Sequence, residues 1–63
     1  MTKSEKQMWI TNIQNTASTV ASLFGNEVAK SVFQRYGAHE IYSLNPCYYS
    51  DVFGDLELIV NDN

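Results

Sequence analysis

The chain has 63 residues, of which 44% are hydrophobic and 17% are charged, and its formal net charge is −3. This composition is typical of one globular domain and unlike that of a disordered chain. A single cysteine and a single histidine exclude an internal disulfide and a structural zinc site, which needs several thiolate or imidazole ligands. No apolar run is long enough for a membrane span or a signal peptide. We therefore expect a soluble cytoplasmic protein without a cofactor.

Charge is distributed unevenly along the chain. The part before residue 37 has four basic and two acidic residues, a net charge of +2, whereas the remainder has five acids and no lysine or arginine. The basic residues are Lys3, Lys6, Lys30 and Arg35, and the acids of the second part are Glu40, Asp51, Asp55, Glu57 and Asp62. Because phosphate contacts need cations, direct nucleic-acid binding through the acidic part is not expected. An acidic surface suits a protein partner that is basic or itself binds nucleic acid.

Residues 4–24 are predicted to form an amphipathic helix. Apolar side chains recur there every three or four residues, namely Trp9, Ile13, Ala17, Val20 and Phe24, with Ile10 and Ala21 beside them. Both Thr2 with Glu5 and Ser4 with Gln7 fit the capping-box pattern at its start. Its opposite face consists largely of serine, threonine and asparagine, which are middling helix formers. This helix should therefore depend on tertiary packing.

A break and a second helix are predicted at Gly25-Asn26. Glycine suits the position just after a helix, and asparagine suits the N-cap of the next one. The second helix should span 27–36, with an apolar stripe formed by Val28, Ala29, Val32, Phe33 and Tyr36. Since this stripe continues in phase from Phe24, one continuous helix is the alternative, because a glycine inside a helix costs only about 1 kcal/mol.

A connector over 38–45 and a third helix over 46–60 are predicted to follow Gly37. Asparagine at 45 is a strong N-cap and proline at 46 is preferred at the first helical position. Leu44 precedes this cap and should pack on Tyr49 as a hydrophobic staple, while Ile41 also points inward. The apolar stripe of the third helix consists of Tyr49, Val52, Phe53, Leu56, Ile59 and Val60. Three such helices with short connections predict an all-α three-helix bundle forming a single domain.

The second half also carries a recognisable segment. It reads Arg35-Tyr36-Gly37-Ala38 and then Leu44-Asn45-Pro46-Cys47-Tyr48-Tyr49-Ser50-Asp51-Val52-Phe53-Gly54-Asp55-Leu56. This pattern resembles the C-terminal tails of uncharacterised small proteins carried on mobile elements of gut bacteria. No activity is assigned to that group, so no functional residues are carried over. The resemblance implies a setting in conjugation, phage or plasmid biology, where small proteins serve as regulators, adapters or inhibitors of host defence.

Two groups of residues are candidates for partner binding. Tyr42 and Tyr48 fit no apolar stripe, and exposed tyrosines are enriched at interfaces, although packing within the connector is the alternative. Asp51, Asp55 and Asp62 share a face of the third helix with Leu58, because spacings of four and seven residues align side chains on a helix. A leucine within an acidic stripe could anchor a partner; the alternative is an ordinary solvated face. Two carboxylates without histidine support are a very weak metal signal.

Two further residues, His39 and Cys47, are candidates for a chemical role. His39 has no positioned acid or nucleophile and fits a solvated loop histidine. Cys47 lies near the start of the third helix, a position where the helix dipole can make a cysteine reactive, so a reactive or intermolecular cysteine is one interpretation. The alternative for Cys47 is a small, partly buried residue that fills space. Because no nucleophile, base and stabiliser can be assembled, we do not expect an enzyme.

These observations lead to three functional hypotheses. The first is a protein-interaction module or accessory protein of a mobile element, with a homodimer left open. The second is an inhibitor of a host defence nuclease, in restriction or CRISPR immunity, that blocks its nucleic-acid-binding site. The third is a small DNA-binding regulator that uses the basic N-terminal half. Helix-turn-helix binding through the third helix is disfavoured because that helix carries acids and no cations, and because the connector is long.

Overall fold

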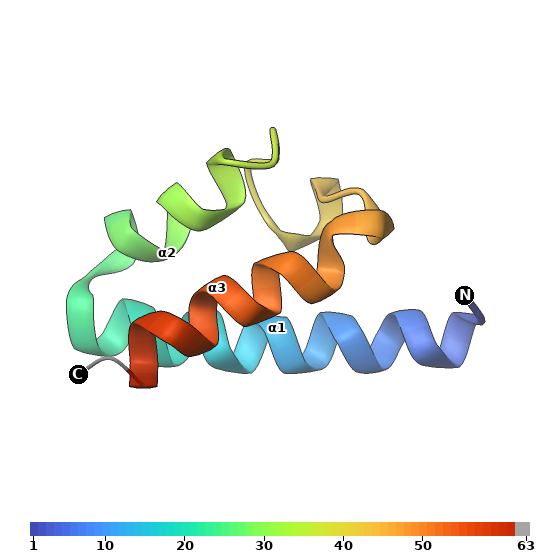
Figure 1. The fold of residues 1–63 in the computed structure, drawn as a ribbon, viewed down its shortest axis with the longest axis horizontal. Coiled ribbons are helices and arrows are strands. Elements are labelled where there is room, and N and C mark those ends of the chain that lie inside the picture. The colour runs from blue at the N-terminus through green and yellow to red at the C-terminus, as the bar shows by residue number, and fades with distance from the viewer. Residues whose placement is uncertain (62–63) are drawn as a thin grey trace.

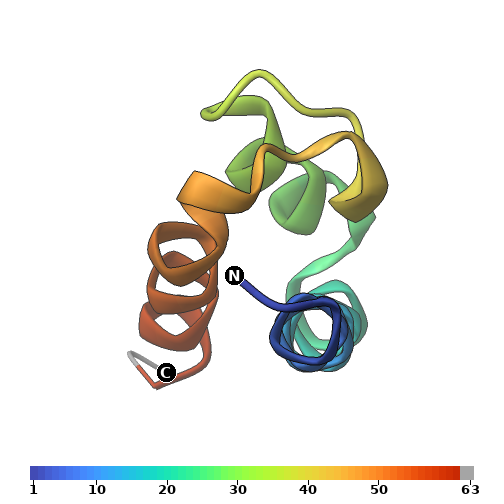
Figure 2. The same cartoon turned by 90° about the vertical axis from the view of Figure 1, so that its right-hand side faces the viewer.

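The computed structural model describes residues 1–61, and within them all regular structure is helical (Figure 1). The elements are α1 (Lys3–Phe24), α2 (Asn26–Gln34), the short 3-10 turns η1 (Ile41–Ser43) and η2 (Pro46–Tyr48), and α3 (Tyr49–Asn61). α1 and α3 run in the same direction, whereas α2, which lies between them in the sequence, runs in the opposite direction (Figure 1). Viewed nearly along α1, α2 and α3 lie on two different sides of that helix (Figure 2). The predicted all-α three-helix bundle is confirmed.

The start of α1 is closed by a capping box. The Thr2 Oγ1 atom accepts a hydrogen bond from the Glu5 backbone N–H at 3.1 Å, and Glu5 Oε1 accepts one from the Thr2 N–H at 3.4 Å. Of the two capping patterns in the sequence, the chain therefore uses the one centred on Thr2. Every side chain from Met1 to Met8 is exposed, and the first buried residue is Ile10. The first two turns of α1 thus project beyond the core.

Gly25 separates α1 from α2, so the alternative of one continuous helix is wrong. Its φ of 101° and ψ of 156° lie in a region essentially restricted to glycine. The Gly25 N–H donates to the Ala21 carbonyl oxygen at 2.9 Å, and Gly25 is also the N-cap of α2. The prediction that Asn26 caps α2 is corrected, because α2 begins at Asn26 itself. One glycine serves both helix ends and leaves no separate cap position.

α2 ends in a Schellman motif around Gly37. The Ala38 N–H donates to the Phe33 carbonyl oxygen and the Gly37 N–H to that of Gln34, both at 3.1 Å, while Gly37 has a φ of 74°. These two bonds define the motif. The regular helix stops at Gln34 rather than at residue 36, because this closing turn begins two residues before the glycine.

The predicted cap at Asn45 is confirmed, but the first turn that it caps is tighter than expected. Asn45 Oδ1 accepts a hydrogen bond from the Cys47 N–H at 3.1 Å. Residues 46–48 form the 3-10 turn η2, and regular α-helix begins at Tyr49 rather than at Pro46. Leu44 and Tyr49, the predicted staple pair, are 4% and 2% exposed and belong to the same buried cluster.

The core follows the predicted apolar stripes with two corrections. The buried hydrophobic residues are Ile10, Ile13, Val20, Ala29, Val32, Phe33, Ala38, Ile41, Leu44, Tyr49, Val52 and Leu56. Trp9 is half-buried and packs edge-on against Phe53, with ring centroids 6.0 Å apart. Phe24 is 37% exposed, because α1 ends there and the chain turns away at the next residue. Ile41 and Leu44 point inward, as predicted.

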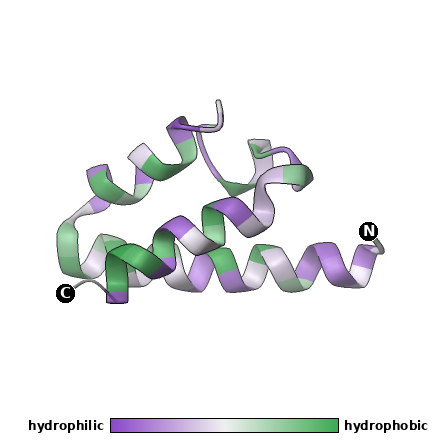
Figure 3. Ribbon diagram, in the orientation of Figure 1, coloured by the Kyte–Doolittle hydropathy of each residue, from purple (hydrophilic) through white to green (hydrophobic). Residues whose placement is uncertain are grey.

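Apolar residues are not spread evenly over the three helices. Figure 3 shows hydrophobic and hydrophilic bands alternating along α1, and a hydrophobic stretch near the C-terminal end of α3, where Leu58, Ile59 and Val60 follow one another. In residues 1–61 no helix combines the length and apolar character needed to cross a bilayer.

Candidate interaction surface

Most of the predicted binding residues lie on the outer side of α3 or immediately before it. Asp51 is exposed, Leu58 is 62% exposed and Tyr48, in the preceding turn η2, is 38% exposed. Asp55 lies on the same helix but is only half-exposed. We call Tyr48, Asp51, Asp55 and Leu58 the acidic face. Asp62, also assigned to this face from the sequence, lies outside the described residues.

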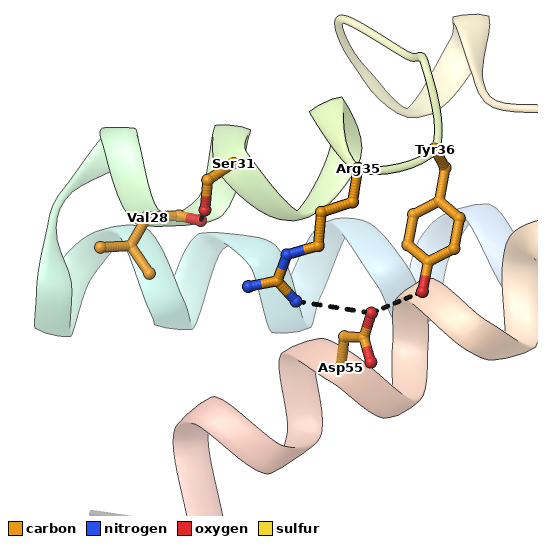
Figure 4. A network of polar contacts seen from close by, with 5 residues as sticks. All are labelled: Val28, Ser31, Arg35, Tyr36 and Asp55. Carbon is orange, nitrogen blue, oxygen red and sulfur yellow. Dashed lines mark hydrogen bonds and ion pairs between the residues drawn. The ribbon is translucent and has the colours of Figure 1, made fainter.

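Asp55 makes contacts within the protein rather than presenting a free carboxylate. The Tyr36 hydroxyl donates a hydrogen bond to Asp55 Oδ2 at 2.6 Å, and Arg35 Nη1 lies 3.7 Å from the same oxygen (Figure 4). The Arg35 and Asp55 side chains are 58% and 28% exposed, so this ion pair is loose and partly screened. Asp55 therefore joins α3 to the end of α2 and is only in part available to a partner.

The Tyr36 hydroxyl is influenced electrostatically by this carboxylate. Its hydrogen bond to Asp55 raises the pKa of Tyr36 above the ordinary value of 10.0, with smaller contributions from desolvation and from the charges of Asp55 and Asp51. The reason is that a phenolate could not donate to Asp55 and would stand beside a like charge. Tyr36 thus remains protonated and holds the junction between α2 and α3 at neutral pH.

The two candidate tyrosines contact different parts of the molecule. The Tyr48 ring lies beside that of Tyr36, with centroids 5.1 Å apart and an interplanar angle of 40°. Tyr42 is 69% exposed, and its hydroxyl accepts a hydrogen bond from Gln14 Nε2 of α1 at 3.3 Å. The structure therefore joins Tyr48 to the acidic face through Tyr36 and leaves Tyr42 against α1.

Asp51 is the freest carboxylate of the acidic face. Among residues 1–61 it takes part in no ion pair and no side-chain hydrogen bond. It lies in the first turn of α3, where a negative charge interacts favourably with the helix dipole. Leu58 follows two turns later on the same side of the helix. An exposed charge and an exposed apolar side chain therefore occur together on a short, well-anchored helix.

The structure places His39 and Cys47 at exposed positions. His39 is exposed, and its backbone N–H donates to Ser43 Oγ at 3.0 Å. Cys47 is exposed, which corrects the view that it fills space in a partly buried position; the tight turn η2 directs it away from the core. In the part of the chain that the structure describes, no three histidine, cysteine, aspartate or glutamate residues are grouped to hold a metal ion.

Two surface hollows were not anticipated from the sequence. One, of about 400 Å³, lies between α1, α2 and the segment before η1, with an apolar floor that includes Ala17, Ala21 and Phe33. The other, of about 230 Å³, is lined by Glu5, Met8, Trp9 and Asn12 of α1. The only sequence feature that pointed to the first hollow was the presence of alanines within the predicted stripes. The feature that pointed to the second hollow was Met8, a methionine next to the stripe that the structure shows to be exposed.

The chain was compared with protein-family models, with curated proteins and with solved structures. None of these comparisons gives a match. The geometry of the described residues is therefore the basis for the functional proposal.

Proposed function

We propose that the protein is an interaction module that binds a basic segment of a partner protein on the acidic face of α3. The observation that carries the proposal is the exposed, unpaired Asp51, two turns from the 62%-exposed Leu58 in the described part of α3. A carboxylate of this kind attracts a lysine or arginine, and the leucine gives the contact an apolar anchor. The Tyr48 ring adds a rigid amphipathic surface beside them.

The anchoring of α3 supports this role. Val52 and Leu56, on its inner side, are fully buried, and Asp55 joins the helix to Tyr36. A rigid helix presents its outer side chains with little conformational freedom left to lose on binding. The resemblance of residues 35–56 to tails of mobile-element proteins supports an accessory role in such an element, which is part of the proposal.

The direct test is retention of a partner by matched charge variants. Tagged protein is incubated with host lysate in the presence of nuclease, and retained proteins are identified by mass spectrometry. Asp51→Lys should lose the partner that the wild-type chain retains, because it places a cation against a basic segment. Glu27→Lys is the control, since it makes the same change in net charge at an exposed position of α2. Equal retention by both variants would refute binding through the acidic face.

An inhibitor that occupies the nucleic-acid-binding site of a defence nuclease is the second candidate. Asp51 and Glu57 both lie on α3, and the helix has no lysine or arginine, so its carboxylates could stand in for phosphates. Arg35 already offsets the charge of Asp55, which leaves fewer free carboxylates than a phosphate mimic would use. Affinity that falls steeply from low to moderate salt would favour the inhibitor, whereas weak salt dependence would favour an interface anchored by Leu58 and Tyr48.

The DNA-binding regulator remains as the third proposal and depends on the N-terminal half. Lys3 and Lys6 lie on the projecting first turns of α1, beside Glu5. A gel-shift experiment at low salt, where phosphate contacts are strongest, would reveal such binding. Absence of a complex under those conditions would remove it.

A further inference from the structure

One side of α1, which we call the flank, lies beside α3 and consists of Met8, Asn12, Asn15, Thr16, Thr19 and Leu23. The composition of this part of the chain is unusual for a solvated helix. No residue between Lys6 and Glu27 is charged, although most side chains there point outward. Solvated helix faces ordinarily carry lysine and glutamate, whereas depletion of charged residues is the compositional mark of the centre of an interface. The same helix exposes Met8 and Leu23, which are 63% and 57% exposed.

Two threonines on this flank are less polar than their residue type indicates. The Thr16 hydroxyl donates to the Asn12 carbonyl oxygen at 3.0 Å, and the Thr19 hydroxyl donates to that of Asn15 at 3.1 Å. A hydroxyl bonded to its own helix backbone does not need water as an acceptor. Covering this flank would therefore leave no threonine donor unsatisfied.

The two ends of the flank are complementary in shape. Toward its N-terminal end lies the hollow of about 230 Å³ lined by Glu5, Met8, Trp9 and Asn12. Toward its C-terminal end the Leu23 side chain projects. Glu5 and Leu23 are about five full helical turns apart and hence lie on the same side of α1. A projecting leucine and an apolar hollow on one side of one helix are the two halves of a self-complementary contact.

We propose that a second copy of the chain docks on this flank, with the two α1 helices antiparallel. Each Leu23 then enters the hollow formed by Met8 and Trp9 of the other copy, and the two-fold axis passes near Asn15 and Thr16. Both contacts are satisfied at once only in the antiparallel arrangement, because the hollow and the leucine lie at opposite ends of the helix. A parallel pair would instead place the Leu23 side chains together and leave both hollows empty.

The charges near the start of α1 do not set the orientation. Lys3 and Lys6 follow the same helical row as Ile10 and Ile13, so they lie away from the flank. Glu5 lines the hollow and, in an antiparallel pair, comes near the negative end of the other helix dipole, which weakens the pair. Glu57, which accepts a hydrogen bond from Thr16 at 3.5 Å, is the charged residue beside the axis, and it opposes the contact.

The size of this contact makes the dimer weak and reversible. The contact covers a strip about 33 Å long and about 10 Å wide on each copy. The total area buried on the two copies is therefore well below the roughly 1,600 Å² of a standard interface. Association should therefore be visible only at high protein concentration. The acidic face of α3 lies outside this strip, so the dimer does not depend on the proposed function.

Sedimentation equilibrium of the full chain, up to about 1 mM protein, tests the proposal. The wild-type average mass should rise with concentration from that of the monomer toward twice that value. Leu23→Asp should weaken the dimer by at least about tenfold, because two desolvated leucines are lost per dimer. Leu58→Asp, an equally exposed leucine on α3, should leave the dimer unchanged. A wild-type chain that stays monomeric, or a Leu23→Asp variant that dimerises equally well, would overturn the proposal.

Cysteine cross-linking tests the orientation in a background where the exposed Cys47 is replaced by serine. A copy with Asn12→Cys and a copy with Thr19→Cys should form a mixed disulfide dimer on oxidation, because antiparallel pairing about Asn15 and Thr16 sets those positions opposite each other. Asn12→Cys mixed with Ser18→Cys is the control, since position 18 lies on the other side of α1. Equal yields in the two mixtures, or cross-links formed only between identical copies, would contradict the antiparallel pair.

Discussion

α1 and α3 run side by side in the same direction, yet their outer surfaces are built from different chemistry. α1 is 22 residues long and carries no charge after Lys6, whereas α3 is 13 residues long and carries Asp51, Asp55 and Glu57. Both bury a row of aliphatic side chains in one core. The difference shows that burial of the inner rows does not decide what the outer surfaces do. A neutral surface can approach its own copy, whereas an acidic one repels its copy and attracts a cationic partner.

The two helices are also connected to the rest of the bundle in different ways. α1 contacts α3 through apolar packing such as Trp9 against Phe53, and through the long 3.5 Å hydrogen bond from Thr16 to Glu57. α3 is joined to the end of α2 by the short hydrogen bond from Tyr36 to Asp55. One of its carboxylates is therefore structural, although the sequence places it in a row of apparent surface charges.

The largest expected effect distinguishes the inner from the outer side of α3. Leu56 is 0% exposed, whereas Leu58 is 62% exposed. Leu56→Ala should lower the free energy of unfolding by about 3 kcal/mol, because it leaves a cavity in a small core. Leu58→Ala should change it by less than about 0.5 kcal/mol. Urea unfolding followed by circular dichroism measures both, and equal losses would mean that the assigned sides of α3 are wrong.

The next effect contrasts two glycines that have open space around them. A Cβ atom at Gly25 or at Gly54 would meet no atom within 4 Å. Of these two glycines only Gly25 has a positive φ, of 101°. Gly25→Ala should cost about 1–3 kcal/mol of backbone strain. Gly54→Ala should stabilise the protein by about 0.5–1 kcal/mol, since alanine is the better helix former. Thermal unfolding of the two variants should give shifts of opposite sign; a shared sign would contradict the assigned backbone conformations.

A smaller effect separates the structural carboxylate from the free one. Asp55→Ala removes the acceptor for the Tyr36 hydroxyl and the partner of Arg35, and should destabilise the protein by about 1 kcal/mol. Asp51→Ala, one turn earlier and exposed, should cost only a few tenths of a kcal/mol from its interaction with the helix dipole. Unfolding in urea at low salt gives the comparison. If Asp51→Ala proved the more damaging, the assignment of roles would be reversed.

The pH dependence of stability offers the most delicate test of the same junction. Because Asp55 raises the pKa of Tyr36 above 10.0, the stability from this pair is present below that ordinary value and is lost as pH rises through the raised pKa. Tyr36→Phe should lose that contribution at neutral pH and show a smaller fall in stability at high pH. Urea unfolding between about pH 8 and about pH 11 measures it, with the other tyrosines and the lysines common to both proteins. Parallel pH profiles would exclude the coupling.

Much of the architecture could be read from the sequence because it depends on local physics. The spacing of apolar residues predicted all three helices, Asn45-Pro46 predicted the third helix start within three residues, and Gly37 predicted the end of the second. These features follow from side-chain periodicity and from backbone preferences that each residue carries with it. The inward direction of Ile41 and Leu44 followed in the same way.

Other features depended on which residues the tertiary structure brings together. Asp55 and Tyr36 are separated by 19 positions in sequence, and no local pattern indicates that this aspartate, unlike Asp51, has a partner. The exposure of Phe24 depends on the direction in which the chain leaves Gly25. The separation of Tyr42 from Tyr48 depends on the path of the connector across α1. Sequence determined which side chains lie along each helix, because that is set by local periodicity; only the packing of the helices decided which of them meet, because such contacts join distant segments.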